Sequence, residues 1–183
     1  MRTISVPSNP FVLRAARRDE LETLCDIDTD ACVLFDRAGF VVELPPEHPY
    51  TLAERARWQR CLDAGSTTVA LDAEARAVGF AALDMLDGEP YLEQLSVREA
   101  CMRRGLGSLL LGDAISTAAS TGAAALWLTT YDHLSWNRPF YERHGFERVG
   151  EEKCGAAIRD ELAHQRLWLP FPERRIAMRR MLR

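Results

Sequence analysis

Apolar residues recur along this chain with helix-like spacing in some stretches and strand-like spacing in others. The pattern predicts a short strand over residues 11–14 and a helix over 18–27. A second helix is predicted over 29–40, after which closely spaced prolines require a loop or extended segment over 43–50. Helical spacing returns over 52–63. The first third of the chain is therefore predicted to be mainly helical.

Strand-like patterns begin at residue 67 and alternate with helices in the last third. The middle of the chain predicts a meander of three strands at 67–71, 78–86 and 91–97, with a turn at Asp87 and Gly88. The elements that follow are predicted as a helix at 105–121, a strand at 124–130, a short helix ending near residue 144, a strand at 146–150, a helix at 156–167 and a strand at 175–182. We expect a single α/β domain over residues 1–183, built on a mixed sheet.

The composition is that of an ordinary globular protein. Of the 183 residues, 47% are hydrophobic and 27% are charged, which suits one domain with a substantial core. The formal net charge of −4 argues against a nucleic-acid binder, since such proteins usually carry a basic excess. Residues 1–10 contain no apolar stretch of signal-peptide length, and the longest apolar run, 122–128, is too short to cross a bilayer. We expect a cytoplasmic protein with neither nucleic acid nor membrane as a partner.

The cysteines are odd in number and widely spaced, and none forms a C-x-x-C pair. They are Cys25, Cys32, Cys61, Cys101 and Cys154. Disulfide frameworks and zinc sites need closer or paired spacing, so we expect free thiols in a reducing compartment and no metal site. Cys101 lies beside a glycine-rich turn but has no apparent histidine partner, so we do not assign it as a nucleophile.

That glycine-rich turn joins the third strand of the meander to the long helix that follows. It contains Arg103, Arg104, Gly105 and Gly107. Glycines permit a tight turn and a close approach of the backbone, and the free N–H groups of a helix's first turn attract anions. Neighbouring arginines add charged donors suited to phosphate. This combination predicts a ligand that carries a diphosphate.

Three known phosphate-binding motifs can be compared with the turn. A Walker A loop requires a lysine directly after its last glycine, and none follows Gly105 or Gly107. The dinucleotide fingerprint G-x-G-x-x-G requires a third glycine where this chain has Leu110. The pyrophosphate loop of acyl-CoA enzymes, [QR]-x-x-G-x-[GA], fits residues 102–107 except at its first position, Met102. The acyl-CoA loop is the best match of the three.

Two blocks of sequence resemble the GNAT superfamily of acyl-CoA-dependent N-acyltransferases. The first comprises Leu95-x-Val97 and the loop at 103–108, and the second, residues 137–146, is similar to the family's Asn…Tyr-x-x-x-Gly-Phe signature. The resemblance extends over residues 11–150, with the last strand closing the sheet. It implies an α/β fold whose mixed sheet has six to seven strands and a splayed central parallel pair, flanked by about four to six helices.

The resemblance also implies acetyl-CoA as cosubstrate. Its pantetheine would lie between the third meander strand and the strand at 124–130, pairing with backbone groups of Leu95 and Val97, and an N–H near Leu95 would polarise the thioester carbonyl. The residues expected to contact the cofactor are Leu95, Ser96, Val97, Met102, Arg103, Arg104, Gly105, Leu106, Gly107, Ser108, Asn137 and Phe140. Met102 replaces the Gln or Arg usual in the family, and Asn137 stands closer to the signature's tyrosine than in its commonest form.

The expected chemistry is direct attack of a primary amine on the thioester, without a covalent enzyme intermediate. An amine arrives protonated, and Glu93 is our candidate general base because related enzymes carry a base on this strand. Two-residue alternation puts Glu93 on one strand face with Leu95 and Val97, whereas Gln94 points the other way. Tyr141 is the expected general acid, because a phenol with a pKa of about 10 can stabilise or protonate a departing thiolate with a pKa of about 8.5.

Plainer interpretations compete with several of these assignments. A non-catalytic acyl-CoA-binding or sensing module would keep the fold and the cofactor loop without needing Glu93 and Tyr141 to converge on the thioester. His133 is expected to be an exposed loop histidine rather than part of the acceptor end. The arginines of the last strand are expected on one solvated face and not as a nucleic-acid footprint.

The amine acceptor is not identified by the sequence. Acidic residues within 26–50 suit a cationic small-molecule or peptide amine, although such charges also occur on plain solvated surfaces. The resemblance places specificity in this segment and in the loop at 130–136. Acyl chain length is left open, and the sequence is compatible with a homodimer.

Overall fold

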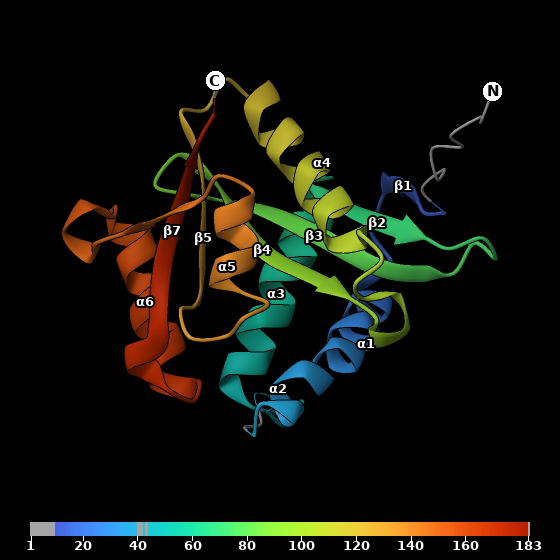
Figure 1. Ribbon diagram of the computed structural model, residues 1–183, viewed down its shortest axis with the longest axis horizontal. Helices are drawn as coiled ribbons and strands as arrows, with labels where there is room; N and C mark the ends of the chain where they lie inside the picture. The colour runs from blue at the N-terminus through green and yellow to red at the C-terminus, as the bar shows by residue number, and fades with distance from the viewer. Residues whose placement is uncertain (1–9, 40–41, 43, 183) are drawn as a thin grey trace, which may run out of the picture.

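Seven strands form one mixed sheet in the computed structural model, which describes residues 10–39, 42 and 44–182 (Figure 1). Their order across the sheet is β1-β2-β3-β4-β5-β7-β6. The strands are β1 (Val12–Ala15), β2 (Thr67–Leu71), β3 (Ala77–Leu86), β4 (Glu89–Val97), β5 (Ala125–Tyr131), β6 (Glu147–Val149) and β7 (Arg175–Met181). The predicted α/β fold with six to seven strands is confirmed, and the predicted strand ends are within two residues of those observed.

Six α-helices lie within the described part of the chain, which agrees with the four to six expected. They are α1 (Leu21–Ala31), α2 (Val33–Arg37), α3 (Pro49–Asp63), α4 (Leu106–Ser120), α5 (Arg138–Arg143) and α6 (Ala156–Trp168). The long helix predicted over 105–121 is α4, with Gly105 as its N-cap, and the amphipathic helix predicted over 156–167 is α6.

Two predictions in the first third of the chain are wrong in their extent. The helix expected over 29–40 is divided at Cys32 and ends at Arg37, because Gly39 adopts a φ of +85° that turns the backbone away from the helix; residue 40 lies outside the described residues. The loop expected over 43–50, also partly outside them, ends early. There α3 begins at Pro49, because proline is tolerated in a first turn and His48 caps the helix.

The strands β2, β3 and β4 form the predicted antiparallel meander. Asp87 and Gly88, both with positive φ, make the tight turn between β3 and β4, as expected from this dipeptide. On its other side β4 is the parallel neighbour of β5, but the two strands pair only at Tyr91 and Trp127. Beyond that point β4 pairs with β3 alone, and the two parallel strands diverge (Figure 1). The predicted splayed pair is thus confirmed.

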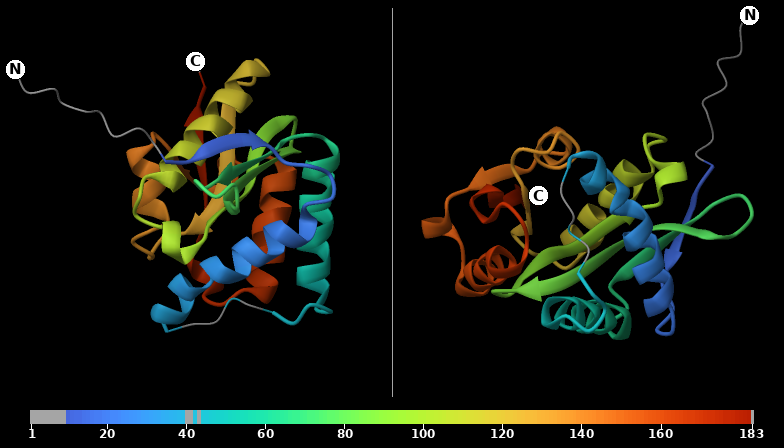
Figure 2. Two further views of the ribbon diagram at one scale, coloured as in Figure 1. Left: turned by 90° about the vertical axis from the view of Figure 1, so that its right-hand side faces the viewer. Right: turned by 90° about the horizontal axis from the view of Figure 1, so that it is seen from below.

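Helices cover both faces of the sheet. On one face α4 and α5 pack over a core that includes Leu110 and Phe140. On the other, α1 and α3 cover β3 around Trp58, while α6 covers β5 and β7 around Ile158. The right-hand view of Figure 2 shows α3 and α6 on one side of β4 and α5 on the other. Across the residues with described placement, no helix has the length and apolar character needed to cross a bilayer.

Candidate active site

A cavity of about 780 Å³ opens where β4 and β5 diverge. The N-terminus of α4 and helix α5 line one part of it, which we call the α4–α5 side, and α1, α3, α6 and β7 line the other, which we call the α3–α6 side. The predicted site residues that line this cavity are Glu93, Leu95, Ser96, Val97, Met102, Arg103, Gly105, Gly107, Ser108, Asn137, Phe140 and Tyr141. The structure thus brings together both sequence blocks of the predicted site.

The N-terminus of α4 presents free backbone donors to the cavity. Arg103 and Gly105 both adopt positive φ, at +59° and +84°, and the helix starts directly afterwards. No N–H group from Arg103 to Ser108 donates to another described residue, and the first to do so is that of Leu109, which bonds the Gly105 carbonyl at 3.0 Å. Consecutive N–H groups at the positive end of a helix dipole form an anion site. This turn therefore fits a pyrophosphate.

Gly107 permits close packing of α4 on α5. A Cβ atom on Gly107 would lie 3.6 Å from the Phe140 ring, which lines the same cavity. The Phe140 ring lies 5.2 Å from that of Tyr141 and 4.6 Å from that of His144, between centroids. The distance of 3.6 Å is an ordinary van der Waals contact, so residue 107 lies directly against this cluster at the cavity wall.

Two residues predicted to contact the cofactor do not line the cavity. Leu106 is 1% exposed and packs in the core between α4 and the sheet, because the first side chain of the helix points to the sheet. Arg104 points away and lies over the Phe11 ring at 5.1 Å. Their side chains point elsewhere, but their backbone N–H groups belong to the free donors of the turn, so cofactor contact through the backbone stays a prediction.

Tyr141 reaches the cavity from the second turn of α5. The helix begins at Arg138, and the carbonyl of its N-cap Asn137 accepts from the N–H groups of Phe140 and Tyr141. The Tyr141 hydroxyl forms no hydrogen bond with any described residue, and burial raises its pKa to about 12. At neutral pH it is a protonated donor with a free hydrogen facing the cavity.

Glu93 occupies a β-bulge in β4. Leu83 of β3 pairs with Leu92 and its neighbour Ala82 pairs with Gln94, so Glu93 is the additional residue. The bulge overturns the predicted alternation: Gln94 turns to the α3–α6 side with Glu93, whereas Leu95 and Val97 pack on the α4 core. Strict two-residue alternation fails because one strand carries one residue more than its partner.

The Glu93 carboxylate is ion-paired with α3. Arg57 Nε donates to Glu93 Oε1 at 2.6 Å, and the two side chains are 13% and 5% exposed. Burial raises the pKa of Glu93, and the Arg57 charge opposes this rise. The pairing holds a carboxylate in an otherwise desolvated position at the cavity wall.

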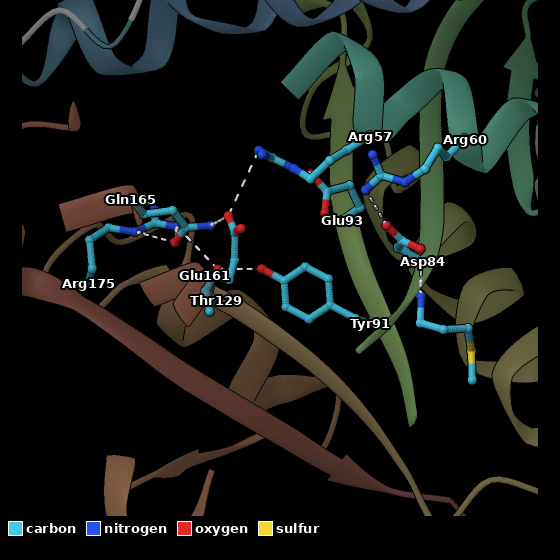
Figure 3. A network of polar contacts seen from close by, with 10 residues as sticks. Arg57, Arg60, Asp84, Tyr91, Glu93, Thr129, Glu161, Gln165 and Arg175 are labelled. Atoms are coloured by element: carbon cyan, nitrogen blue, oxygen red, sulfur yellow. Dashed lines mark hydrogen bonds and ion pairs between the residues drawn. The ribbon is translucent and has the colours of Figure 1, made fainter. Parts of the chain in front are cut away.

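The Glu93 pair belongs to a longer polar network, drawn in Figure 3. Arg57 Nη2 lies 3.8 Å from the Glu161 carboxylate of α6, which accepts from Gln165 at 2.7 Å, and Gln165 in turn accepts from Arg175 of β7. The network joins α3, α6 and β7 across the cavity. Of these residues the sequence analysis singled out only Glu93, since nothing in their spacing indicates the contacts.

Two further carboxyl groups lie on the α3–α6 side, Asp28 from the predicted acidic segment and Glu54, which the sequence did not indicate. Asp28 of α1 accepts from Ser96 at 2.5 Å and also from Gln94. Glu54 of α3 lines the cavity and has its pKa raised to about 8, first by burial and then by the Asp28 charge. An acidic charge was expected for segment 26–50, but the position of Glu54 depends on how α3 crosses the sheet.

Solvent exposure was predicted for His133 and for the arginines of the last strand, and the structure agrees with the first prediction but only in part with the second. His133 is exposed, as predicted, and packs its ring on Tyr131 and Phe171 rather than lining the cavity. The prediction of a solvated arginine face is wrong for Arg175. That side chain is 8% exposed and lines the cavity, because β7 lies inside the sheet between β5 and β6.

Comparison with solved structures shows a fold shared with acetyltransferases. A GNAT-family acetyltransferase from Staphylococcus aureus Mu50 is 17% identical with a TM-score of 0.67, and the match covers 94% of this chain and 99% of that one. PaiA N-acetyltransferase from Thermoplasma acidophilum, solved with coenzyme A, is 15% identical with a TM-score of 0.63, covering 93% and 98%.

N-acetylglutamate synthase from Neisseria gonorrhoeae, solved with coenzyme A and N-acetyl-glutamate, is similar over a part of its length. It is 16% identical with a TM-score of 0.66, and the match covers 94% of this chain but 35% of the synthase. This chain therefore spans about a third of that protein.

A profile of the Acetyltransferase (GNAT) family matches residues 21–146. The match contains the free donors at the start of α4, the splayed strands and the Tyr141 helix. It covers well over half of the chain and agrees with the geometry of the cavity. The chain belongs to the GNAT acetyltransferase family.

Proposed function

We propose that this protein is an N-acetyltransferase that moves an acetyl group from acetyl-CoA to a primary amine by direct attack. GNAT enzymes use acetyl-CoA, which supplies an acetyl thioester and a thiolate leaving group. The observation that carries the proposal is the convergence, on one cavity, of the free N–H groups of the α4 turn, the open edge of β4, Glu93 and Tyr141.

The α4–α5 side fits the donor molecule. Free N–H groups from Arg103 to Ser108 suit the pyrophosphate, and the Arg103 side chain adds a positive charge at the same wall. Leu95 and Val97 belong to the stretch of β4 that pairs with β3 only, so its other edge is available to the pantetheine amides. An N–H of this edge near Leu95 polarises the thioester carbonyl.

Glu93 removes the proton from the incoming ammonium. Its carboxylate lines the cavity, and the hydrogen bond from Arg57 fixes its direction. Burial raises its pKa, which makes the carboxylate a stronger base, while the Arg57 charge opposes that rise and favours the charged form. The mechanism therefore needs both side chains.

Tyr141 stabilises the departing thiolate. With a pKa of about 12 it stays protonated, and its free hydroxyl points a donor into the cavity. Full proton transfer to a thiolate with a pKa of about 8.5 is uphill by several pH units, in contrast to the near balance expected from an ordinary phenol. Tyr141 therefore acts first as a hydrogen-bond donor, and the proton follows when the thiolate is also desolvated.

Direct transfer is supported by the state of Cys25, one of two cysteines, with Cys32, that line the cavity. Cys25 lines the cavity, but burial raises its pKa to about 11. A thiol in that state is a poor nucleophile at neutral pH. Mass spectrometry of the enzyme quenched during turnover is expected to find no acetylated cysteine.

Two measurements test the proposal. Thermal unfolding is expected to shift upward with acetyl-CoA and CoA and not with NADH or ATP, since a ligand at ~100 times its Kd stabilises a protein by about 2.7 kcal/mol. Thiol release from acetyl-CoA is then expected to depend on an added primary amine and to fall with Glu93→Gln. A shift in unfolding without release by any amine would favour the non-catalytic sensing module.

A further inference from the structure

Arg175 is a buried cation on the α3–α6 side of the cavity. Its side chain is held by Gln165 Oε1, which accepts from Nε at 3.1 Å and from Nη2, and by Thr129 Oγ1 at 3.4 Å from Nη2. Its guanidinium also lies over the Tyr131 ring, 4.6 Å from the centroid. These contacts fix the plane and the orientation of the guanidinium before any ligand binds.

No carboxylate neutralises this guanidinium. Among the described residues, no carboxylate oxygen lies within 4.0 Å of Arg175, and the nearest acid of the network, Glu161, is bound by Gln165 and faces Arg57. The hydrogen bonds to Gln165 and Thr129 engage Nε and Nη2 of Arg175, and the Tyr131 hydroxyl is a further partner of this side chain. All of these partners are neutral, and a buried, oriented guanidinium held by neutral groups is suited to a ligand carboxylate.

Glu54 is the complementary group on the same side of the cavity. Its carboxylate forms no ion pair or hydrogen bond with a described residue, and it lines the cavity from α3. Tyr50, one helical turn earlier, lies in the electrostatic range of both groups: after burial, Glu54 raises and Arg175 lowers the pKa of its hydroxyl. Tyr50, Glu54 and Arg175 all line the same cavity.

We infer that the acceptor carries a carboxylate as well as its amine, as an amino acid does, and that Arg175 binds this carboxylate while Glu54 faces the ammonium. The inference rests on the proposed N-acetyltransferase function and names the substrate class of the same site. A polyamine lacks the group that Arg175 requires, and burying Arg175 without a counter-ion is costly.

The first experiment uses the wild-type protein and compares acceptors that differ only at the carboxylate. Thiol release from acetyl-CoA is measured with the common L-amino acids, with the α-carboxamides of the best of them, and with putrescine and spermidine, over a range of pH. The best free acid is expected to exceed its carboxamide by ~10- to 100-fold in kcat/KM, since a hydrogen bond to a charged group is lost. Equal rates for acid and carboxamide, or the highest rates with a polyamine, would overturn the inference and leave the proposed function standing.

The second experiment tests whether Arg175 is the residue responsible for the preference for a free acid over its carboxamide. Arg175→Met is expected to raise the KM for the amino acid by ~10-fold or more and to leave that of the carboxamide and of acetyl-CoA unchanged. Arg179→Met is the matched control, because Arg179 lies on the same strand over the Trp127 ring and does not line the cavity. An unchanged acid-to-carboxamide ratio in folded Arg175→Met would refute the assignment. If Arg175→Met does not fold, the wild-type comparison of acid and carboxamide decides the inference alone. Absence of thiol release with every amine tested would instead refute the proposed function itself.

Discussion

Arg57 of α3 donates to Glu93 in the bulge of β4 at 2.6 Å, and this bond joins a helix to the one unpaired residue of the central strand. Both side chains are largely buried. The bulge turns Glu93 toward the α3–α6 side, where burial raises its pKa and the Arg57 charge opposes that rise. The position of Glu93 in the sequence reveals neither the side of the sheet to which its side chain points nor its ion-pair partner.

Removing the Arg57 charge is expected to change the pH dependence of the reaction. Arg57 lowers the pKa of Glu93 against the effect of burial, so Arg57→Gln raises that pKa further. A base works only when deprotonated, and the acidic limb of the kcat/KM profile should therefore move to higher pH by about 1–3 units. The pH profile of thiol release measures this directly.

Arg60→Gln is the matched control for that variant. Arg60 lies on the same helix and pairs with Asp84, but it is 60% exposed and does not line the cavity. Its removal should leave the acidic limb in place, and Arg57→Lys should restore it in part. An unshifted limb in Arg57→Gln would exclude Glu93 as the titrating base.

Tyr141→Phe is expected to lower kcat by ~100-fold or more while leaving the Kd for acetyl-CoA nearly unchanged. The substitution removes the free hydroxyl and keeps the ring that packs against Phe146 and Phe140. Tyr131→Phe serves as the control, since its hydroxyl donates to the Pro170 carbonyl at 2.7 Å and does not line the cavity. A Tyr141→Phe enzyme as fast as the wild type would remove Tyr141 from the mechanism.

Gly105→Ala should weaken acetyl-CoA binding beyond its effect on stability. Gly105 has a φ of +84°, where a Cβ atom costs about 1–2 kcal/mol, and it lies at the anion site of α4. Gly122, at the other end of α4, has a φ of +78° and lies outside the cavity lining. Gly122→Ala should lower the Tm to a similar degree without changing the acetyl-CoA Kd, measured by calorimetry. Equal Kd values for both variants would argue against the α4 turn as the pyrophosphate site.

Glu20 makes fold stability depend on acid pH. Arg14, whose guanidinium donates to it at 2.6 Å, lowers the pKa of this buried carboxyl to about 2 from 4.5. A carboxyl whose pKa is lower in the folded than in the unfolded protein stabilises the fold fully at pH values above the unfolded pKa of 4.5. The free energy of unfolding should therefore fall progressively, by about 3 kcal/mol, as the pH drops from 4.5 toward 2. Urea unfolding against pH measures the slope.

The control for this prediction is the adjacent, exposed carboxylate. Asp19 is 82% exposed, and Asp19→Asn should keep the slope, whereas Glu20→Gln should flatten it and lower stability at neutral pH. A Glu20→Gln protein with the wild-type slope would show that the acid sensitivity lies elsewhere.

Local signals were sufficient to predict most residues that line the α4–α5 side of the cavity. The turn at Gly105 and Gly107 and the Tyr141 helix are each a continuous stretch of sequence with its own glycine or proline marker. Leu106 and Arg104 were the exceptions, because a motif match does not say which side chains near a helix's first turn point away from the cavity.

Contacts between distant segments were not accessible to the same reasoning. The bulge at Glu93 depends on the register between two strands, which the regular alternation of β4 does not show. Arg175 was assigned to a solvated face because the sequence does not reveal that β6 returns outside β7. Glu54 is one glutamate of an ordinary helix, and only the crossing of α3 over the sheet brings it to the cavity.

Detection of the acetylated product is the decisive test of N-acetyl transfer by this protein. The protein is incubated with isotopically labelled acetyl-CoA and a panel of primary amines, and the products are separated and identified by mass spectrometry. We expect label in an amide of at least one amine, and we expect it to depend on Glu93 and Tyr141. Label found only in acetyl-CoA and free acetate, with every amine unchanged, would contradict N-acetyl transfer.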